Sequence, residues 1–248
     1  MIVWREKLLA FAIHFAATLA LALLAAGLIF FVWFPSPYAE MVGGSKLFLL
    51  LVGCDLALGP LISLVIYNSR KSRRELYIDY SIVALVQIAA LVYGMSVSFG
   101  SRPIFVVFAT DRFEVMTSNE IAAEDSEEAR LSEFRDRSMW GPELVAAVVP
   151  PEDHNDALDQ ALAGKDISAR PKFFVPYESQ LDRIREKAKP LAALTRKRPE
   201  ANGLIAAEFD GEPPAVITWL PVKHKNGFWT ALLNEDGRPI RYVPIDPY

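Results

Sequence analysis

Three long apolar segments occupy the first hundred residues of the chain, at residues 8–34, 47–67 and 79–99. A helix needs about 20 residues to cross the hydrocarbon core of a bilayer, and each segment is long enough. These segments raise the hydrophobic fraction to 52%, which is high for a soluble domain. We therefore expect a membrane α-helical protein, with three transmembrane helices in residues 1–100 and a soluble domain in residues 101–248.

The charge balance differs between the two parts of the chain. Through Ser98 there are 7 basic and 5 acidic residues. After Ser98 there are 19 basic and 25 acidic residues, which gives this second part a net charge of −6. An acidic domain without a basic stripe argues against nucleic-acid binding. The single cysteine, Cys54, cannot form an intrachain disulfide, and the three histidines are too scattered for a metal site. We expect no cofactor and no metal.

Basic residues in the loops predict the orientation of the helices. Arg5 and Lys7 precede the first helix, and the second loop has four basic residues: Arg70, Lys71, Arg73 and Arg74. By the positive-inside rule, the N-terminus and the second loop face the cytoplasm, and the soluble domain lies on the other side of the membrane. The first apolar segment is longer than the core of a signal peptide. We expect it to stay as a membrane helix, with cleavage near Gly27 as the alternative.

The second part of the chain has the pattern of an α+β domain. Two short β-rich runs, residues 104–108 and 113–116, are spaced as a hairpin. Thr117 and Glu120 match a capping box, which predicts a polar helix through about Arg137.

Further elements of this domain follow from hydrophobic spacing and turn residues. We expect a strand at residues 144–149, a helix at 152–162 and a helical segment at 177–198 that Pro190 kinks or ends. Asn-Gly and Asp-Gly pairs, which favour tight turns, separate the last three β-rich runs. These runs, at residues 215–222, 228–234 and 238–243, predict a C-terminal β-meander.

Polar residues inside the apolar segments are the strongest candidates for function. Asp55 lies well inside the second segment, where a charge costs about 2.5–3.5 kcal/mol on insertion scales. Gln87 lies at a comparable depth in the third segment, and His14 lies in the first. Gly59 and Pro60 follow Asp55, and the proline predicts a kink. The set is either a binding site for a polar group on another membrane helix or an internal cluster that fixes helix packing.

Asp111 and Arg112 form a second candidate pair, between the two runs of the predicted hairpin. They are either a site for an anionic ligand or a salt bridge in a turn. The sequence contains no nucleophile elbow, phosphate loop or HExxH motif. We therefore expect no catalytic residues.

The second segment carries a recognisable motif. Cys54 and Asp55, followed by Gly59-Pro60-Leu61-Ile62-Ser63, resemble the DxxxGPLLT segment of type IV pilin accessory proteins of the TfpX/TfpZ family, which are similar to FimB fimbrial assembly proteins. Ser63 replaces the usual threonine and keeps its hydroxyl. Further matches are His14, Trp33, Pro35, Lys71, Asp79, Gln87, Tyr93, Arg102, Asp111 and Arg112. The resemblance covers residues 1–121 and is weak beyond them.

The resemblance implies an inner-membrane protein of a Gram-negative bacterium with a periplasmic C-terminal domain. It implies a non-enzymatic accessory protein, or chaperone, that assists the expression, stability or assembly of a cognate type IV pilin. The partners would be the major pilin subunit, which has an apolar membrane helix and a periplasmic head, and membrane lipid, with no small-molecule substrate. The candidate partner-binding residues are then Asp55, Gly59, Pro60, Gln87, His14, Asp111 and Arg112. The alternatives are a membrane enzyme acting on a lipid-linked substrate and a structural subunit or sensor of another envelope complex.

Overall fold

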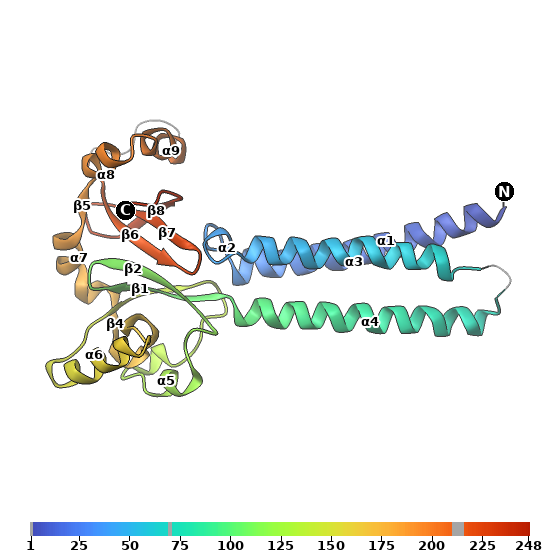
Figure 1. Cartoon of the computed structure of the whole chain (residues 1–248), viewed down its shortest axis with the longest axis horizontal. Helices are drawn as coiled ribbons and strands as arrows, with labels where there is room; N and C mark the ends of the chain where they lie inside the picture. Colours follow the sequence, from blue (N-terminus) through green and yellow to red (C-terminus); the bar gives the residue numbers. More distant parts are fainter. Residues whose placement is uncertain (1, 69–70, 210–215) are drawn as a thin grey trace. The chain divides into compact units, whose positions relative to one another are not determined.

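The computed structural model describes residues 2–68, 71–209 and 216–248. The chain divides into two compact units, Met1–Ser101 and Arg102–Tyr248, which we call the helical unit and the C-terminal domain. The predicted fold class is confirmed, because three long apolar helices precede a domain of helices and a curled sheet (Figure 1). Arg70 of the expected basic loop and Ala215, the expected start of a strand, lie outside the described residues.

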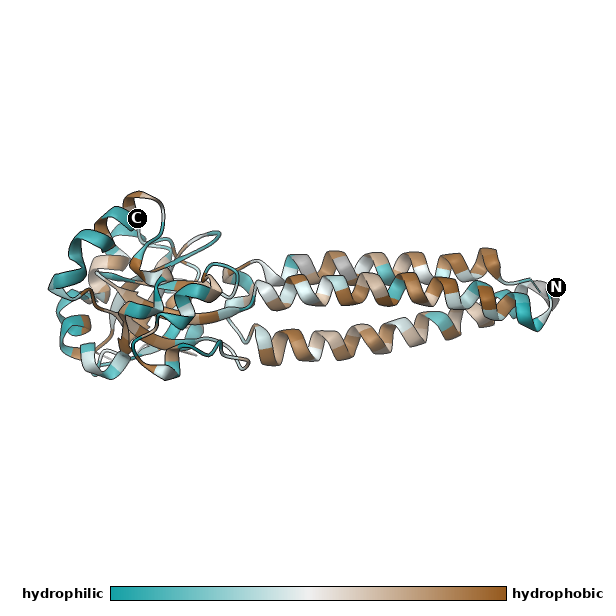
Figure 2. Ribbon diagram, turned by 90° about the horizontal axis from the view of Figure 1, so that it is seen from below, coloured by the Kyte–Doolittle hydropathy of each residue, from teal (hydrophilic) through white to brown (hydrophobic). Residues whose placement is uncertain are grey.

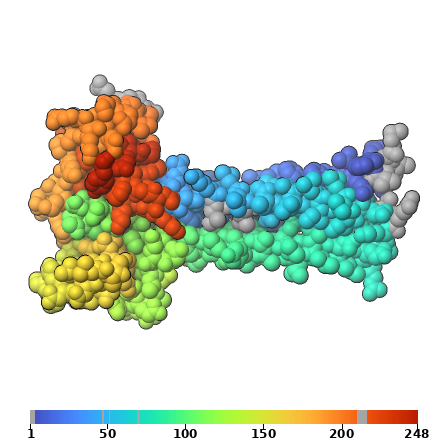
Figure 3. Space-filling view, in the orientation of Figure 1, coloured from blue at the N-terminus to red at the C-terminus, as the bar shows by residue number. Residues whose placement is uncertain are grey.

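Three helices of the described chain are long and apolar enough to cross a membrane. The helical unit consists of α1 (Ile2–Leu28), a π-helical turn η1 (Ile29–Trp33), the short α2 (Tyr38–Met41), α3 (Gly44–Ile66) and α4 (Arg73–Gly100). A capping box starts α4, where Ser72 and Glu75 each accept a hydrogen bond from the other's backbone N–H. The helices α3 and α4 run side by side in the space-filling view (Figure 3).

Aromatic packing holds one end of the helical unit together. Phe34 is buried against Gly44, where an added Cβ would lie 3.0 Å from its ring. Trp33 at the end of η1 meets Phe99 of α4 edge to face, with ring centroids 5.1 Å apart. Such pairs add about 0.5–1.5 kcal/mol beyond their buried area. The three helices are therefore connected at this end by side-chain contacts as well as by short loops.

The C-terminal domain is built on one sheet with strand order β4-β3-β1-β2-β6-β7-β8. Neighbouring strands are antiparallel except for β1–β3 and β2–β6, which are parallel. The short β5 pairs with β6 off this path. The strands are β1 (Pro103–Ala109), β2 (Arg112–Thr117), β3 (Glu143–Ala147), β4 (Phe174–Pro176), β5 (Lys189–Pro190), β6 (Thr218–His224), β7 (Gly227–Leu233) and β8 (Pro239–Val243). The predicted hairpin and C-terminal meander are thus confirmed.

Short helices surround this sheet; α6, yellow in Figures 1 and 3, lies at the surface of the domain. The α-helices are α5 (Ala123–Glu127), α6 (His154–Leu162), α7 (Leu181–Lys187), α8 (Leu191–Lys197) and α9 (Ala201–Glu208). The 3₁₀ turns are η2 (Ser132–Phe134), η3 (Pro151–Asp153), η4 (Ile167–Ala169), η5 (Pro171–Phe173) and η6 (Tyr177–Gln180). As expected, the helical segment at residues 177–198 is interrupted at Pro190, which lies in β5.

The prediction of a polar helix between Thr117 and Arg137 is wrong. The backbone N–H of Thr117 does donate to Glu120 Oε2 at 2.8 Å, but the chain turns there, and only α5 and η2 are helical. Ile121 is buried in the core, and its carbonyl accepts a hydrogen bond from Arg137 Nη2 at 2.9 Å. Long-range contacts therefore replace the local bonds that a continuous helix would make.

Central strand β1 explains how the domain forms its core. All seven of its residues are buried, as expected for a strand covered on both faces. Phe105 packs edge to face against Phe174 and Phe134, with centroids 5.1 and 6.5 Å away. A second apolar cluster lies around Trp219 and Leu232 of the meander.

Candidate functional site

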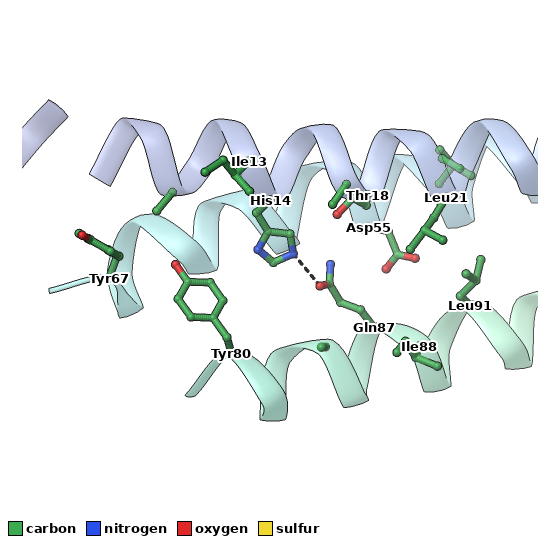
Figure 4. Close-up of a pocket in the computed structure, with 15 residues that line it drawn as sticks. Ile13, His14, Thr18, Leu21, Asp55, Tyr67, Tyr80, Gln87, Ile88 and Leu91 are labelled. Atoms are coloured by element: carbon green, nitrogen blue, oxygen red, sulfur yellow. Dashed lines mark hydrogen bonds between the residues drawn. The ribbon is translucent and has the colours of Figure 1, made fainter. Parts of the chain in front are cut away.

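A cavity of about 500 Å³ lies between α1, α3 and α4 of the helical unit (Figure 4). Most of its wall is apolar, with Ile13 and Leu21 on α1 and Ile88 and Leu91 on α4. The polar residues that line it are His14, Thr18, Asp55, Tyr67, Tyr80 and Gln87. The structure therefore brings together three residues that the sequence singled out from three separate segments: His14, Asp55 and Gln87.

A hydrogen-bond chain through His14 joins all three helices. The Nε2 of His14 lies 2.8 Å from Oε1 of Gln87 on α4, and its Nδ1 lies 2.5 Å from Oγ of Ser63 on α3. The Gln87 oxygen is an acceptor, so a neutral imidazole carries its proton on Nε2, and the Ser63 hydroxyl donates to Nδ1. Exposing any of these polar groups to lipid without a hydrogen-bond partner would cost free energy. The chain thus links α4 to α1 and α3.

Gly59 provides the space that this chain needs. A Cβ at position 59 would lie 2.1 Å from Nε2 of Gln87 and 3.1 Å from Nε2 of His14. Both Gly59 and Pro60 are buried in α3. The sequence indicated this pair as a kink, which stays a prediction. The steric role of Gly59 depends on a side chain of another helix, so no local pattern reveals it.

Asp55 and Tyr80 line the cavity without a hydrogen-bond partner among the described residues. The Asp55 carboxylate points from α3 into the cavity (Figure 4). The Tyr80 hydroxyl is buried and unpaired, and its ring centroid lies 6.4 Å from that of His14. Buried polar groups without a partner cost about 1–3 kcal/mol each. The cavity therefore offers two polar groups that a bound molecule can satisfy.

Sequence reasoning missed Tyr80 and two contacts near the loop between α3 and α4. Tyr80 precedes Gln87 by two helical turns, so the helical period places both on one face of α4. Lys7 Nζ donates to the carbonyl of Leu64 at 3.0 Å, where a cation also suits the C-terminal end of α3. Lys71 Nζ and Asp79 Oδ2, whose residues both belong to the family resemblance, form a salt bridge of 2.5 Å.

Asp111 and Arg112 belong to the C-terminal domain, at the turn of the β1–β2 hairpin. Arg112 Nε lies 3.8 Å from Asp111 Oδ1 and 3.3 Å from Oε1 of Glu114. Glu114 is buried, and its Oε2 accepts from the Ser168 hydroxyl and from Lys223 Nζ, each at 3.0 Å. This geometry favours the interpretation as a salt bridge in a turn, anchored by a carboxylate that the sequence did not single out.

Within the described ranges, no three His, Cys, Asp or Glu side chains gather closely enough to hold a metal ion. The cavity instead combines an apolar wall, small side chains and a few polar groups. In a membrane, close packing and a few hydrogen bonds are what hold helices together. The arrangement is chemically suited to binding a polar group within an apolar environment.

Comparisons with known proteins identify relatives of this chain. The model of the fimbrial assembly protein FimB family matches residues 2–43. The serogroup I fimbrial assembly protein of Dichelobacter nodosus is 40% identical over 182 residues, which is 73% of this chain and 70% of that protein. The serogroup E1 protein of the same organism is 38% identical over the same shares. The protein of serogroups C1 and C2 is 39% identical over 117 residues, which is 47% of this chain and 89% of that protein.

No solved structure matches the chain. The similarity to the serogroup I and E1 proteins extends over most of each chain. The matched length of 182 residues is greater than either unit alone, so the similarity extends into both the helical unit and the C-terminal domain. This chain belongs to the FimB family of fimbrial assembly proteins.

Proposed function

We propose that this protein is a non-catalytic accessory factor that binds a type IV pilin subunit within the membrane and assists its stability or assembly. The observation that carries this proposal is the cavity between α1, α3 and α4, in which Asp55 and Tyr80 have no hydrogen-bond partner within the described part of the chain. Membership of a fimbrial assembly family supports a role in the assembly of fimbriae. The resemblance to pilin accessory proteins supports the partner.

The membrane helix of the pilin docks along this cavity. Small side chains on the α1 side of the cavity, at Ala10, Ala17 and Ala22, allow another helix to approach closely. Asp55 donates or accepts a hydrogen bond according to its protonation, so it fits a polar side chain of either kind. Each such bond within the membrane is worth about 0.6–2 kcal/mol. A single polar contact at Asp55 therefore adds both affinity and a fixed register along the helix.

In this proposal the protein lies in the bacterial inner membrane with its N-terminus in the cytoplasm and its C-terminal domain in the periplasm. The basic residues Lys71, just before α4, and Arg73 and Arg74, in its first turn, support this orientation. The C-terminal domain then lies on the same side as the pilin head and selects the cognate pilin. Alkaline phosphatase fused after Ile104 should be active, and a fusion after Lys71 inactive. The reverse pattern would refute the orientation.

Photo-crosslinking in pilin-expressing cells tests the docking site. A photoreactive amino acid at Thr18 faces the cavity, whereas one at Leu24 on the same helix is 72% exposed and does not line it. We expect pilin crosslinks from Thr18 and few from Leu24. Equal yields from both positions, or none from Thr18, would contradict docking in the cavity.

Substitution of Asp55 tests the polar contact. Asp55→Leu should weaken co-purification of pilin by about 3- to 30-fold, the equivalent of one hydrogen bond of 0.6–2 kcal/mol. Asp55→Asn keeps the shape and the hydrogen-bonding capacity, so it separates a required charge from a required hydrogen bond. If Asp55→Leu abolished pilus display while the Thr18 crosslinks persisted, pilin would still dock, and the loss would favour the enzyme alternative over a binding role for Asp55.

A further inference from the structure

A short loop before β3 displays two large apolar side chains at the surface of the C-terminal domain. Trp140 is 80% exposed, and the adjacent Met139 is 47% exposed. A single exposed leucine is ordinary in a soluble domain. Two neighbouring large side chains, one of them an indole, instead indicate a surface that meets a less polar environment than water.

Hydrogen bonds hold this loop in a defined position. Arg102 Nε donates to the carbonyl of Ser138 at 3.2 Å, and the backbone N–H of Trp140 donates to Ser138 Oγ at 3.2 Å. Arg137 donates to the carbonyl of Ser118 at 3.0 Å. Gly141 then turns the chain with a φ of 76°. Trp140 is therefore presented on a fixed support, which lowers the conformational entropy that binding would cost.

The same contacts tie the loop to Arg102, the residue with which the C-terminal domain begins. The third membrane-competent helix, α4, ends at Gly100, and Arg102 follows within about 7 Å of extended chain. A helix that crosses the membrane brings Arg102 to the interface between lipid and water. Ser138 is hydrogen-bonded to Arg102, and Trp140 is only two residues further along the chain. Through this chain connection and the Arg102–Ser138 hydrogen bond, the loop is tethered close in sequence and contact to the residue that follows α4.

The chemistry of the loop matches that environment. An indole settles at the headgroup level of a membrane, because its ring is apolar and its N–H donates a hydrogen bond. We propose that Met139 and Trp140 insert into the lipid headgroup region and hold the C-terminal domain at the membrane surface. This anchor requires α4 to span the membrane, but it does not require a pilin.

Fluorescence quenching in lipid nanodiscs tests the anchor on the full-length protein. Cys54→Ser removes the native thiol, and a single cysteine then carries an environment-sensitive nitrobenzoxadiazole label at position 140. The matched control carries the label at Leu162, which is also 80% exposed but lies on α6. We expect blue-shifted emission and quenching by lipids with a shallow spin label at position 140, and neither effect at position 162. Position 139 should behave like position 140.

Two outcomes would overturn the proposal. One is water-like, unquenched emission at position 140, equal to that at position 162. The other is emission at position 140 that shifts only when purified pilin is added, which would assign the loop to a protein partner. Misfolding does not confound these results, because Trp140 is exposed and the loop is held by the backbone and side chain of Ser138.

Discussion

Many large apolar side chains of the helical unit are exposed, whereas most of those in the C-terminal domain are buried. Apolar residues colour much of the three long helices brown in Figure 2. Phe31 of the helical unit is 84% exposed, while the His14–Ser63–Gln87 chain lies between the helices. In the C-terminal domain all of β1 is buried, and ion pairs such as Asp156–Lys172 lie nearer the surface. Lipid is as apolar as leucine, so apolar side chains gain little by leaving it. The two units are therefore stabilised by different forces.

Replacing one phenylalanine by alanine in each unit should give the largest difference in the free energy of unfolding. Phe105→Ala removes a fully buried ring that contacts Phe134 and Phe174, and we expect it to destabilise the C-terminal domain by about 3–5 kcal/mol. Phe31→Ala removes a ring that faces outward and should have little effect on the free energy of unfolding. Proteolysis of the full-length protein in nanodiscs at increasing urea concentration measures both. Equal losses of stability in the two variants would mean that the helical unit also depends on apolar burial.

A pair of glycine substitutions tests the polar chain in the helical unit. Gly59→Ala places a methyl group where Gln87 Nε2 lies, so the flexible end of Gln87 must move away and the bond to His14 is lost. We expect a loss of about 0.6–2 kcal/mol, measured by titration with sodium dodecyl sulfate and followed by helix circular dichroism. Gly53→Ala is the matched control on α3, because nothing lies within 4 Å of its added Cβ. If both variants behaved alike, the His14–Gln87 bond would not contribute to packing.

The smallest expected effect concerns surface charge in the C-terminal domain. Hydrogen bonds from Lys172 and then Arg170, at 2.7 and 2.6 Å, hold the pKa of Asp156 below its usual value. A carboxyl whose pKa is lower in the folded state stabilises the fold above its unfolded pKa of about 3.9, and this contribution is lost as the pH falls through the folded pKa. Stability of the wild type should therefore decrease below about pH 4 by more than that of Asp156→Asn.

Proteolysis over pH 3–6 checks this decrease. Asp159→Asn is the control on the same helix, because Asp159 forms no ion pair within the described chain. Its pH profile should match that of the wild type. If the pH profile of Asp156→Asn were identical to that of the wild type, the contacts with Lys172 and Arg170 would add nothing to stability.

Much of the fold follows from local patterns in the sequence. Runs of about 20 apolar residues can be satisfied as helices in a membrane because a helix pairs its backbone groups internally. The hairpin of β1 and β2 and the meander of β6, β7 and β8 follow from β-rich runs separated by short turn segments, such as the turn at Gly237 with a φ of 83°. These features depend on neighbours in the chain, which the sequence displays directly.

Contacts between distant residues decided the rest. Their neighbours in the chain already mark His14, Asp55 and Gln87 as unusual residues in apolar segments, and the motif around Asp55 indicates the family. Contacts across the fold show that His14 bonds Gln87 and that Asp55 has no hydrogen-bond partner among the described residues. They also show that Gly59 makes room for the His14–Gln87 bond and that residues 117–137 turn instead of forming one helix. The parallel pairing of β1 with β3 and of β2 with β6 is likewise not readable from local spacing. Each of these features depends on atoms that the fold brings together from separate segments, so no single stretch of sequence contains the information.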